Sequence, residues 1–164
     1  ARRQRQMCIR DRAVMDALTK RYKCVRYDQL EGDDVLGILA TSKEFNDPII
    51  VSPDKDMRTV PCKLLAGDDL ELITKRQADR NWMIQALTGD NTDNYKGISG
   101  VGSVTANKIL GDTKTLSDMW DIVVKEYEKK SGGYKEALLT ARLSRILRTG
   151  DYNIQSKKIK LWKP

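Results

Sequence analysis

The sequence predicts an α/β fold that is followed by a smaller helical part. Two observations support this prediction: helical spacing of apolar residues alternates with short apolar runs up to about residue 95, and strand signals largely disappear after residue 97. Helices and strands that alternate along a chain are typical of an α/β sheet. We therefore expect one boundary, which divides the chain into residues 1–95 and residues 96–164.

Three helices and two strands are expected in the first part. Apolar residues at helical spacing predict helices over residues 12–22, 33–43 and 75–88. The segment "KCVRY", residues 23–27, is a short strand candidate, and an apolar run predicts a strand over residues 48–52. The first helix spaces Val14, Leu18 and Tyr22 along one side, and the second is expected to turn four side chains inward: Val35, Leu36, Ile38 and Leu39. The third carries Trp82, Met83, Ala86 and Leu87, and Gly89 is expected to end it.

The second part is expected to be almost entirely helical. Apolar spacing predicts helices over residues 100–110, 116–130 and 134–150, and the last residues, 157–164, predict a short terminal strand.

Composition excludes several classes of protein. The 164 residues are 40% hydrophobic and 32% charged, and no apolar run is long enough to cross a bilayer, so a soluble protein without membrane contact is expected. Three cysteines without CxxC spacing favour a reducing compartment, the cytoplasm, over a disulfide framework or a zinc site. The sequence contains no histidine, which excludes a Ser-His-Asp triad, a Cys-His pair and a His-ligated zinc within it.

The net charge of +7 is unevenly distributed. Residues 1–30 carry a balance of +6, residues 31–124 a balance of −6, and residues 125–164 a balance of +7. Two interpretations remain open. The charges are solvated helix faces, or the basic ends hold a polyanion while the acidic centre holds cations.

The acidic residues of the centre form three clusters. The first is Glu31, Asp33 and Asp34, at the start of a predicted helix, where the helix dipole favours carboxylates. The second is Asp54 and Asp56, which follow a predicted strand; in extended backbone both would project to the same side, at the strand end where α/β sheets place ligands. Ordinary helix capping and a polar turn are the alternative interpretations.

The third cluster, Asp90 and Asp93, leads into a glycine-rich turn. Glycines permit close approach of a backbone, and the N-terminus of a helix offers N–H groups to a phosphate. The alternative is a tight turn whose glycines only relieve strain. The residues of this turn and its helix that are predicted to contact a phosphate backbone are Gly97, Gly100, Gly102, Ser103, Thr105 and Lys108.

These seven carboxylates without histidine predict a site for hard cations. Mg²⁺ or Mn²⁺ suits such oxygen ligands better than zinc does. Two such ions about 4 Å apart can activate water and stabilise both oxygens of a phosphoryl displacement.

At these residues the sequence resembles the 5′ nuclease family, the flap endonucleases and 5′→3′ exonucleases, and in particular the 5′→3′ exonucleases of short-tailed phages. The resemblance covers roughly residues 13–164 and rests on the order and spacing of "LEGDD", "VSPDKDM", "TGDNTDNYKGISGVG" and "ARLSRILRTGDYN…IKLWKP". It implies a resolvase-like (PIN-like) metal-dependent nuclease core over residues 1–95. It also implies a DNA-binding region over residues 96–164, with a helix-three-turn-helix motif at residues 97–111.

The resemblance also implies roles for the carboxylates. Glu31 and Asp33 correspond to ligands of a first metal ion, and Asp34 to a further acidic position of that cluster. The second ion corresponds to Asp54, Asp56 and Asp93, with Asp90 as an adjacent acidic residue. The residues expected to be catalytic are Asp33, Asp54, Asp56 and Asp93.

One part of the family pattern has no counterpart in this sequence. Family members begin with a strand ending in an aspartate, a second aspartate, and a helical arch that holds the free 5′ end. The segment "ARRQRQMCIRDR" matches none of these. We therefore expect a fragment of a longer protein or one half of a split enzyme, which cleaves poorly by itself.

The function implied is divalent-metal-dependent hydrolysis of DNA from 5′ ends. The expected substrate is duplex DNA with a 5′ end, nick or flap, with RNA–DNA hybrids as a further substrate, and the expected setting is a monomer in the cytoplasm, that of an infected bacterium if a phage encodes it. Two alternatives are a DNA-binding remnant without catalysis and an RNA-processing nuclease with a similar core.

Overall fold

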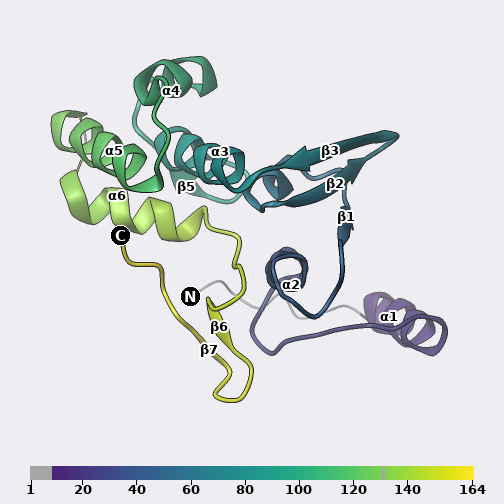
Figure 1. The fold of residues 1–164 in the computed structure, drawn as a ribbon. Coiled ribbons are helices and arrows are strands. Elements are labelled where there is room, and N and C mark those ends of the chain that lie inside the picture. Colours follow the sequence, from purple (N-terminus) through teal and green to yellow (C-terminus); the bar gives the residue numbers. More distant parts are fainter. Residues whose placement is uncertain (1–8, 131) are drawn as a thin grey trace.

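The computed structural model describes residues 9–130 and 132–164, which form a mixed α/β fold (Figure 1). The helices are α1 (Ile9–Arg21), α2 (Gly32–Ala40), α3 (Lys75–Thr88), α4 (Ser103–Leu110), α5 (Leu116–Lys130) and α6 (Gly133–Leu143). The strands are β1 (Ile49–Val51), β2 (Cys62–Ala66), β3 (Asp69–Ile73), β4 (Gly89–Asp90), β5 (Tyr95–Lys96), β6 (Tyr152–Asn153) and β7 (Lys158–Ile159). A short 3₁₀ helix, η1 (Lys55–Thr59), lies between β1 and β2.

The three-stranded sheet has the order β1-β2-β3. Strand β1 pairs with β2 in parallel, with Ile50 opposite Leu64, and β2 and β3 form an antiparallel hairpin. Side chains alternate between the two faces of a strand. One face therefore buries Ile50, Leu64 and Ile73 against Met57, Val60 and Ala78, while Ile49, Val51, Leu70 and Leu72 are exposed on the other.

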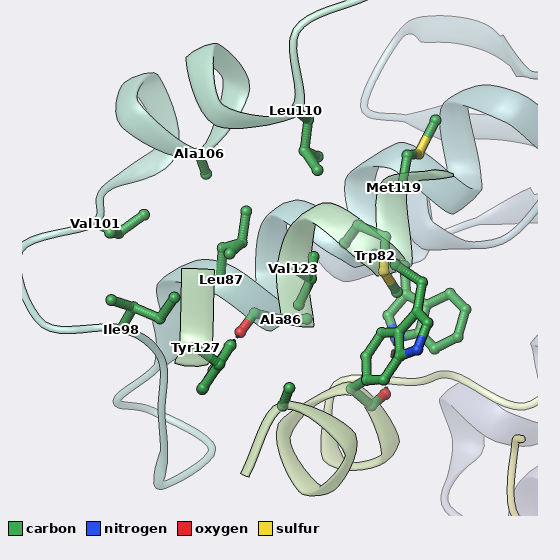
Figure 2. Close-up of a cluster of buried hydrophobic side chains, with 14 residues drawn as sticks. Trp82, Ala86, Leu87, Ile98, Val101, Ala106, Leu110, Met119, Val123 and Tyr127 are labelled. Atoms are coloured by element: carbon green, nitrogen blue, oxygen red, sulfur yellow. Dashed lines mark hydrogen bonds between the residues drawn. The ribbon is translucent and has the colours of Figure 1, made fainter. Parts of the chain in front are cut away.

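Helix α3 joins this sheet to the helical part of the molecule. Ala78 belongs to the core beneath the sheet, whereas Trp82, Met83, Ala86 and Leu87 belong to a second core that α3 shares with α4, α5 and α6 (Figure 2). Two hydrogen bonds fix this packing: Trp82 Nε1 donates to the carbonyl of Ala141 (2.8 Å), and the Tyr127 hydroxyl donates to that of Ala86 (2.7 Å). One rigid helix thus connects the two halves of the chain.

The bounds of α3 follow from local chemistry. Thr74 and Gln77 form a capping box, in which each side chain accepts a hydrogen bond from the other residue's backbone N–H. Gly89 ends the helix with a φ of 68°, a value that glycine adopts without strain. The predicted helix 75–88, its four buried apolar residues and its glycine stop are all confirmed.

Several other elements differ from the sequence predictions. Residues 23–27 form no strand, because within the described part of the chain no strand lies beside them to complete a ladder. Helix α1 forms, but it ends at Arg21, and Val14 and Leu18 on the helix and Tyr22 directly after it are all exposed. Leu36 of α2 is exposed rather than inward, while Val35 and Ile38 are buried as expected.

The last predicted helix is shorter than expected. Helix α6 ends at Leu143, although helical spacing continues to residue 150. The backbone N–H groups of Leu147 and Arg148 donate to the side chains of Asp34 and Asp151 instead of to a preceding helical turn. The strands of the β2–β3 hairpin were not predicted, and the terminal strand is reduced to β7, which pairs with β6.

The core around α3 predicts that substitution of two different leucines changes the free energy of unfolding by very different amounts. Leu87→Ala should lower the free energy of unfolding by about 2–5 kcal/mol, because Leu87 is fully buried and its removal leaves a cavity. Leu72→Ala, on the exposed face of β3, should change it by less than about 0.5 kcal/mol. Urea unfolding of both variants measures the difference. Equal destabilisation would contradict the assignment of the core.

Candidate metal-binding site

The first acidic cluster lies at the N-terminus of α2. Glu31 is the N-cap residue, in extended conformation, and its side chain accepts no capping hydrogen bond; Asp33 and Asp34 occupy the first turn. The positive end of the helix dipole favours carboxylates at these positions. Burial of Val35 and Ile38 fixes the helix, so that Asp33 lies half-buried at its end.

The second cluster lies where β1 leads into η1. The Asp54 carboxylate accepts a hydrogen bond from the backbone N–H of Asp56 (2.8 Å) and thereby caps η1. The backbone therefore bends here, and the prediction that both aspartates project from extended backbone is wrong. The Gln85 side chain of α3 donates to the Asp56 carboxylate (2.6 Å), which fixes that side chain against α3.

The third cluster lies on the short β4–β5 hairpin that follows α3. Asp90 accepts a hydrogen bond from the backbone N–H of Thr92 (2.7 Å) and pairs with Lys55 (2.9 Å). The hairpin is very tight: a side-chain carbon at Gly97 would collide with the backbone of Thr88 and Gly89. Gly97 therefore has a packing role, whatever else it contacts.

The three clusters meet in one cavity of about 200 Å³. Its lining includes all seven carboxylates predicted to form the site: Glu31, Asp33, Asp34, Asp54, Asp56, Asp90 and Asp93. The other side chains of the lining were not anticipated, and they include Lys55, Tyr95, Ser144 and Arg145. Lys55 stands between the two aspartates in the sequence and could have been found there, but nothing in the sequence marks Arg145 as a neighbour of the site.

Crowding changes the acidity of two of these carboxyl groups. Burial raises the pKa of Asp33, and the charges of Asp54, Asp34, Glu31 and Asp93 raise it further. The pKa of Asp56 is also raised, first by burial and then by Asp54. In contrast, the hydrogen bond from Lys55 lowers the pKa of Asp90. The cavity thus favours the entry of positive charge.

The donor set fits a divalent cation in its chemistry. It consists of carboxylate oxygens without histidine or cysteine, the ligands preferred by Mg²⁺ and Mn²⁺. In the described residues, however, no three of these carboxylates stand close enough together to hold an ion as they are placed. Like charges repel, which favours such separation. Binding of a cation therefore requires the side chains to converge within the cavity.

The glycine turn forms a second, more open hollow. It has a volume of about 550 Å³ and is lined by Thr88, Asn91, Lys96 and residues 97–102. Gly100 and Gly102 are exposed, and a side-chain carbon at either would meet no atom within 4 Å. Helix α4 begins directly after the turn and carries Ser103, Thr105 and Lys108, all of them exposed. The backbone of the turn is therefore open to a ligand.

The chain is similar to several nucleases. It is 30% identical to the "Exonuclease" of Escherichia phage T7 over 186 aligned positions, covering 92% of this chain and 62% of that protein. It is 30% identical to the "5'-3' exonuclease" of Aquifex aeolicus, covering 82% and 51%, and 28% identical to the "Flap endonuclease Xni" of a Shewanella strain, covering 73% and 53%. No protein-family model matches.

The chain belongs to the 5′ nuclease family. It spans about three fifths of the length of the phage relatives and about half of the other two. Each alignment with the phage proteins covers 92% of the chain, so it includes the carboxylate cavity or most of it. None of the helices in the described residues has the length and apolar character needed to span a membrane.

The raised pKa of Asp33 predicts that this family member is more stable without that charge. In the presence of a chelator at neutral pH, Asp33→Asn should raise the midpoint temperature of unfolding. The folded-state pKa of Asp33 lies above its unfolded value of 3.8, so the ionised group destabilises the fold above the folded-state pKa. The advantage of the variant should shrink as the pH falls through that value.

Thermal unfolding followed by circular dichroism, from neutral pH down to about pH 4, measures this difference. Asp69→Asn is the matched control, because Asp69 is an exposed carboxylate on β3 outside the cavity. A midpoint for Asp33→Asn below that of the wild type at neutral pH would contradict the crowding described above.

Proposed function

We propose that the whole protein is a divalent-metal-dependent nuclease that hydrolyses DNA from 5′ ends, as an exonuclease or flap endonuclease. The observation that carries this proposal is the meeting of seven carboxylates from three separate segments in one cavity. The names of the related exonucleases and flap endonucleases support the same activity. The phage relatives support a role in phage replication or in breakdown of host DNA.

Two groups of carboxylates would hold Mg²⁺ or Mn²⁺. Glu31 and Asp33 would bind a first ion, and Asp54, Asp56 and Asp93 a second, with Asp90 beside them. Two such ions would supply activation of water and stabilisation of the attacking and leaving oxygens of the phosphodiester. We assign Asp34 to neither ion and give it a positioning role, in which its carboxylate accepts a hydrogen bond from the backbone N–H of Leu147.

The other residues of the cavity position these ligands. The amide of Gln85 fixes the orientation of Asp56, and the backbone N–H of Asp56 fixes that of Asp54. Lys55 balances part of the negative charge through its pair with Asp90. Such contacts orient the ligands before a substrate arrives and reduce the reorganisation needed for reaction.

The glycine turn would hold the duplex. Residues 1–95 would form a resolvase-like nuclease core, and residues 96–164 a DNA-binding region in which residues 97–111 act as a helix-three-turn-helix motif. The exposed backbone at Gly100 and Gly102 and the N-terminus of α4 support this assignment, because they offer N–H groups to a phosphate. Contacts to phosphates set the register of the duplex and carry no sequence information.

A second candidate function is DNA binding without catalysis by this chain. It is favoured by one observation: in the described residues no three carboxylates stand in position to hold an ion. Incubation with Mn²⁺ and a 5′-labelled nicked duplex separates the two. Release of nucleotides that a chelator blocks shows catalysis, whereas duplex binding without release shows a binding module.

The proposed ligand set predicts the effect of two substitutions in the full-length protein. Asp54→Ala or Asp56→Ala should reduce cleavage of a 5′ flap at least about a hundredfold, the scale expected for loss of a preorganised electrostatic group. Duplex binding should remain within about threefold, because the glycine turn is unchanged. Rate and binding are measured with the same labelled flap in Mg²⁺, and cleavage near the wild-type rate in either variant would refute the ligand assignment.

The glycine turn predicts a loss of binding that is independent of sequence. Gly102→Val fits the fold, because Gly102 has a φ of −89° and no atom lies within 4 Å of an added side-chain carbon. The bulkier side chain should nevertheless block a phosphate and weaken binding about tenfold on duplexes of every sequence. Fluorescence anisotropy on several unrelated duplexes tests this, and a loss limited to some sequences would contradict a phosphate contact.

A further inference from the structure

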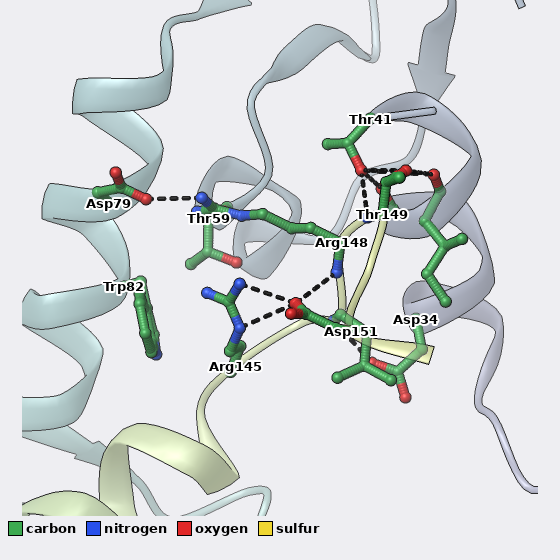
Figure 3. A network of polar contacts seen from close by, with 12 residues as sticks. Asp34, Thr41, Thr59, Asp79, Trp82, Arg145, Arg148, Thr149 and Asp151 are labelled. Atoms are coloured by element: carbon green, nitrogen blue, oxygen red, sulfur yellow. Dashed lines mark hydrogen bonds and ion pairs between the residues drawn. The ribbon is translucent and has the colours of Figure 1, made fainter. Parts of the chain in front are cut away.

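Residues 144–151, which we call the clasp, connect α6 to the β6–β7 hairpin without regular secondary structure. The clasp begins in the wall of the carboxylate cavity, which Ser144, Arg145 and Ile146 help to line. It then contacts α2, η1 and α3, and its polar contacts are shown in Figure 3.

The clasp is bound to both ends of α2. Near the N-terminus of the helix, the backbone N–H of Leu147 donates to the Asp34 carboxylate (3.1 Å). At the C-terminus, the backbone N–H of Thr149 donates to the Thr41 hydroxyl (2.8 Å), and the Thr149 hydroxyl donates to the carbonyl of Ile38 (2.9 Å). These bonds fix the position of α2 along its axis, and with it the position of the first acidic cluster.

The same segment is bound to η1 and α3 through one arginine. The guanidinium of Arg148 donates to the carbonyl of Thr59 at the end of η1 (2.7 Å) and to the Asp79 carboxylate of α3 (2.6 Å). Arg148 and Asp79 are both buried, and a buried ion pair is stable only when its hydrogen bonds are well formed. Removal of either partner would therefore disturb η1, which carries Asp56.

The clasp itself is rigid. One carboxylate oxygen of Asp151 accepts hydrogen bonds from Arg145 Nε (3.0 Å), Arg145 Nη2 (2.7 Å) and the backbone N–H of Arg148 (2.9 Å). The Arg145 guanidinium also stacks on the Trp82 ring, 4.5 Å from its centre. These contacts fix the conformation of the clasp, so that the clasp can hold α2 and η1 at a fixed distance from each other.

Gly37 of α2 shows how closely the clasp approaches this helix. A side-chain carbon at Gly37 would collide with the carbonyl oxygen of Leu147 and would lie 2.8 Å from the Ile146 side chain. Glycine is thus required here for the two backbones to meet. The two backbones are therefore in direct contact, which fixes the distance between the clasp and α2.

We propose that the clasp sets the spacing between the carboxylates of α2 and those of η1, and that Asp34 is a positioning residue that anchors the clasp to α2 rather than a metal ligand. This inference rests on the proposed metal-binding function. Contacts outside the ligands commonly change metal affinity by about 10–100-fold, because they hold the ligands at the required distance.

Thr149 provides the sharpest test, since it is uncharged and lies outside the residues that line the cavity. Thr149→Val removes the hydroxyl bonded to Ile38 and should weaken binding of Mn²⁺ about tenfold, while Thr149→Ser keeps the hydroxyl and should restore it. Mn²⁺ affinity is measured on the chain from the electron paramagnetic resonance signal of the free ion, and thermal unfolding with a chelator confirms that each variant is folded.

A purely structural role for Thr149 would lower the unfolding temperature of Thr149→Val and leave the Mn²⁺ affinity of the folded protein unchanged, and that result would overturn the inference. Asp34 adds a second comparison. Asp34→Asn keeps an acceptor for Leu147 and should lose much less Mn²⁺ affinity than Asp34→Ala. Equal losses would identify Asp34 as a ligand and also overturn the inference.

A separate comparison tests the proposed metal-binding function itself. If the wild-type chain takes up no more Mn²⁺ than a variant in which Asp33, Asp54, Asp56 and Asp93 are all replaced by asparagine, the cavity is not a metal site. If the wild type binds Mn²⁺ more tightly than this fourfold variant does, but Thr149→Val binds as the wild type does, the metal site stands and only the role of the clasp is refuted.

Discussion

Repulsion among seven carboxylates in one cavity is the constraint on which the rest of the structure depends. A different local structure positions each cluster: the start of α2 for Glu31 and Asp33, the cap of η1 for Asp54, and the β4–β5 hairpin for Asp90. Lys55 offsets part of the charge through its pair with Asp90. The remaining charge raises the pKa of Asp33 and Asp56, which is the expected electrostatic state of a cation site before its ion binds.

The connection between this cavity and the glycine turn is short. Helix α3 packs on both cores, and the β4–β5 hairpin that follows it carries Asp93 and leads directly to Gly100. A duplex held at the turn would therefore be held at a fixed distance from the carboxylates. Because α3 packs on both cores and both of its ends are capped, the hairpin and the turn begin from a fixed position.

The sequence predicted the parts of the fold that depend on local chemistry. Helix α3 was predicted with both bounds because Gly89 and its apolar spacing act within a few residues, and β1 because "PIIVS" is an uninterrupted apolar run. The strands of the β2–β3 hairpin were missed because charged residues such as Lys63 and Glu71 interrupt their apolar pattern, and their pairing supplies the stability. The segment at residues 23–27 resembles a strand in its sequence, but a strand forms only where a partner lies beside it.

The acidic residues of the site were also visible in the sequence, because helix capping and turn formation rarely require carboxylates at the ends of three separate elements. Their convergence in one cavity could be inferred only from the family resemblance. The clasp could not be predicted, since its hydrogen bonds join residues 69 to 113 positions apart, from Arg148 to Asp79 and from Leu147 to Asp34. Its sequence shows only helical spacing, which gives no sign of those partners.

The central claim, that these carboxylates form one divalent-cation site, is tested most directly by displacement of Mn²⁺ by Mg²⁺. The chain is titrated with Mn²⁺ at neutral pH, the bound fraction is determined from the paramagnetic signal of the free ion, and Mg²⁺ is then added. We expect saturable uptake of Mn²⁺, its release by Mg²⁺, and loss of uptake when Asp33, Asp54, Asp56 and Asp93 are all replaced by asparagine. Uptake that this fourfold substitution leaves unchanged would contradict the claim.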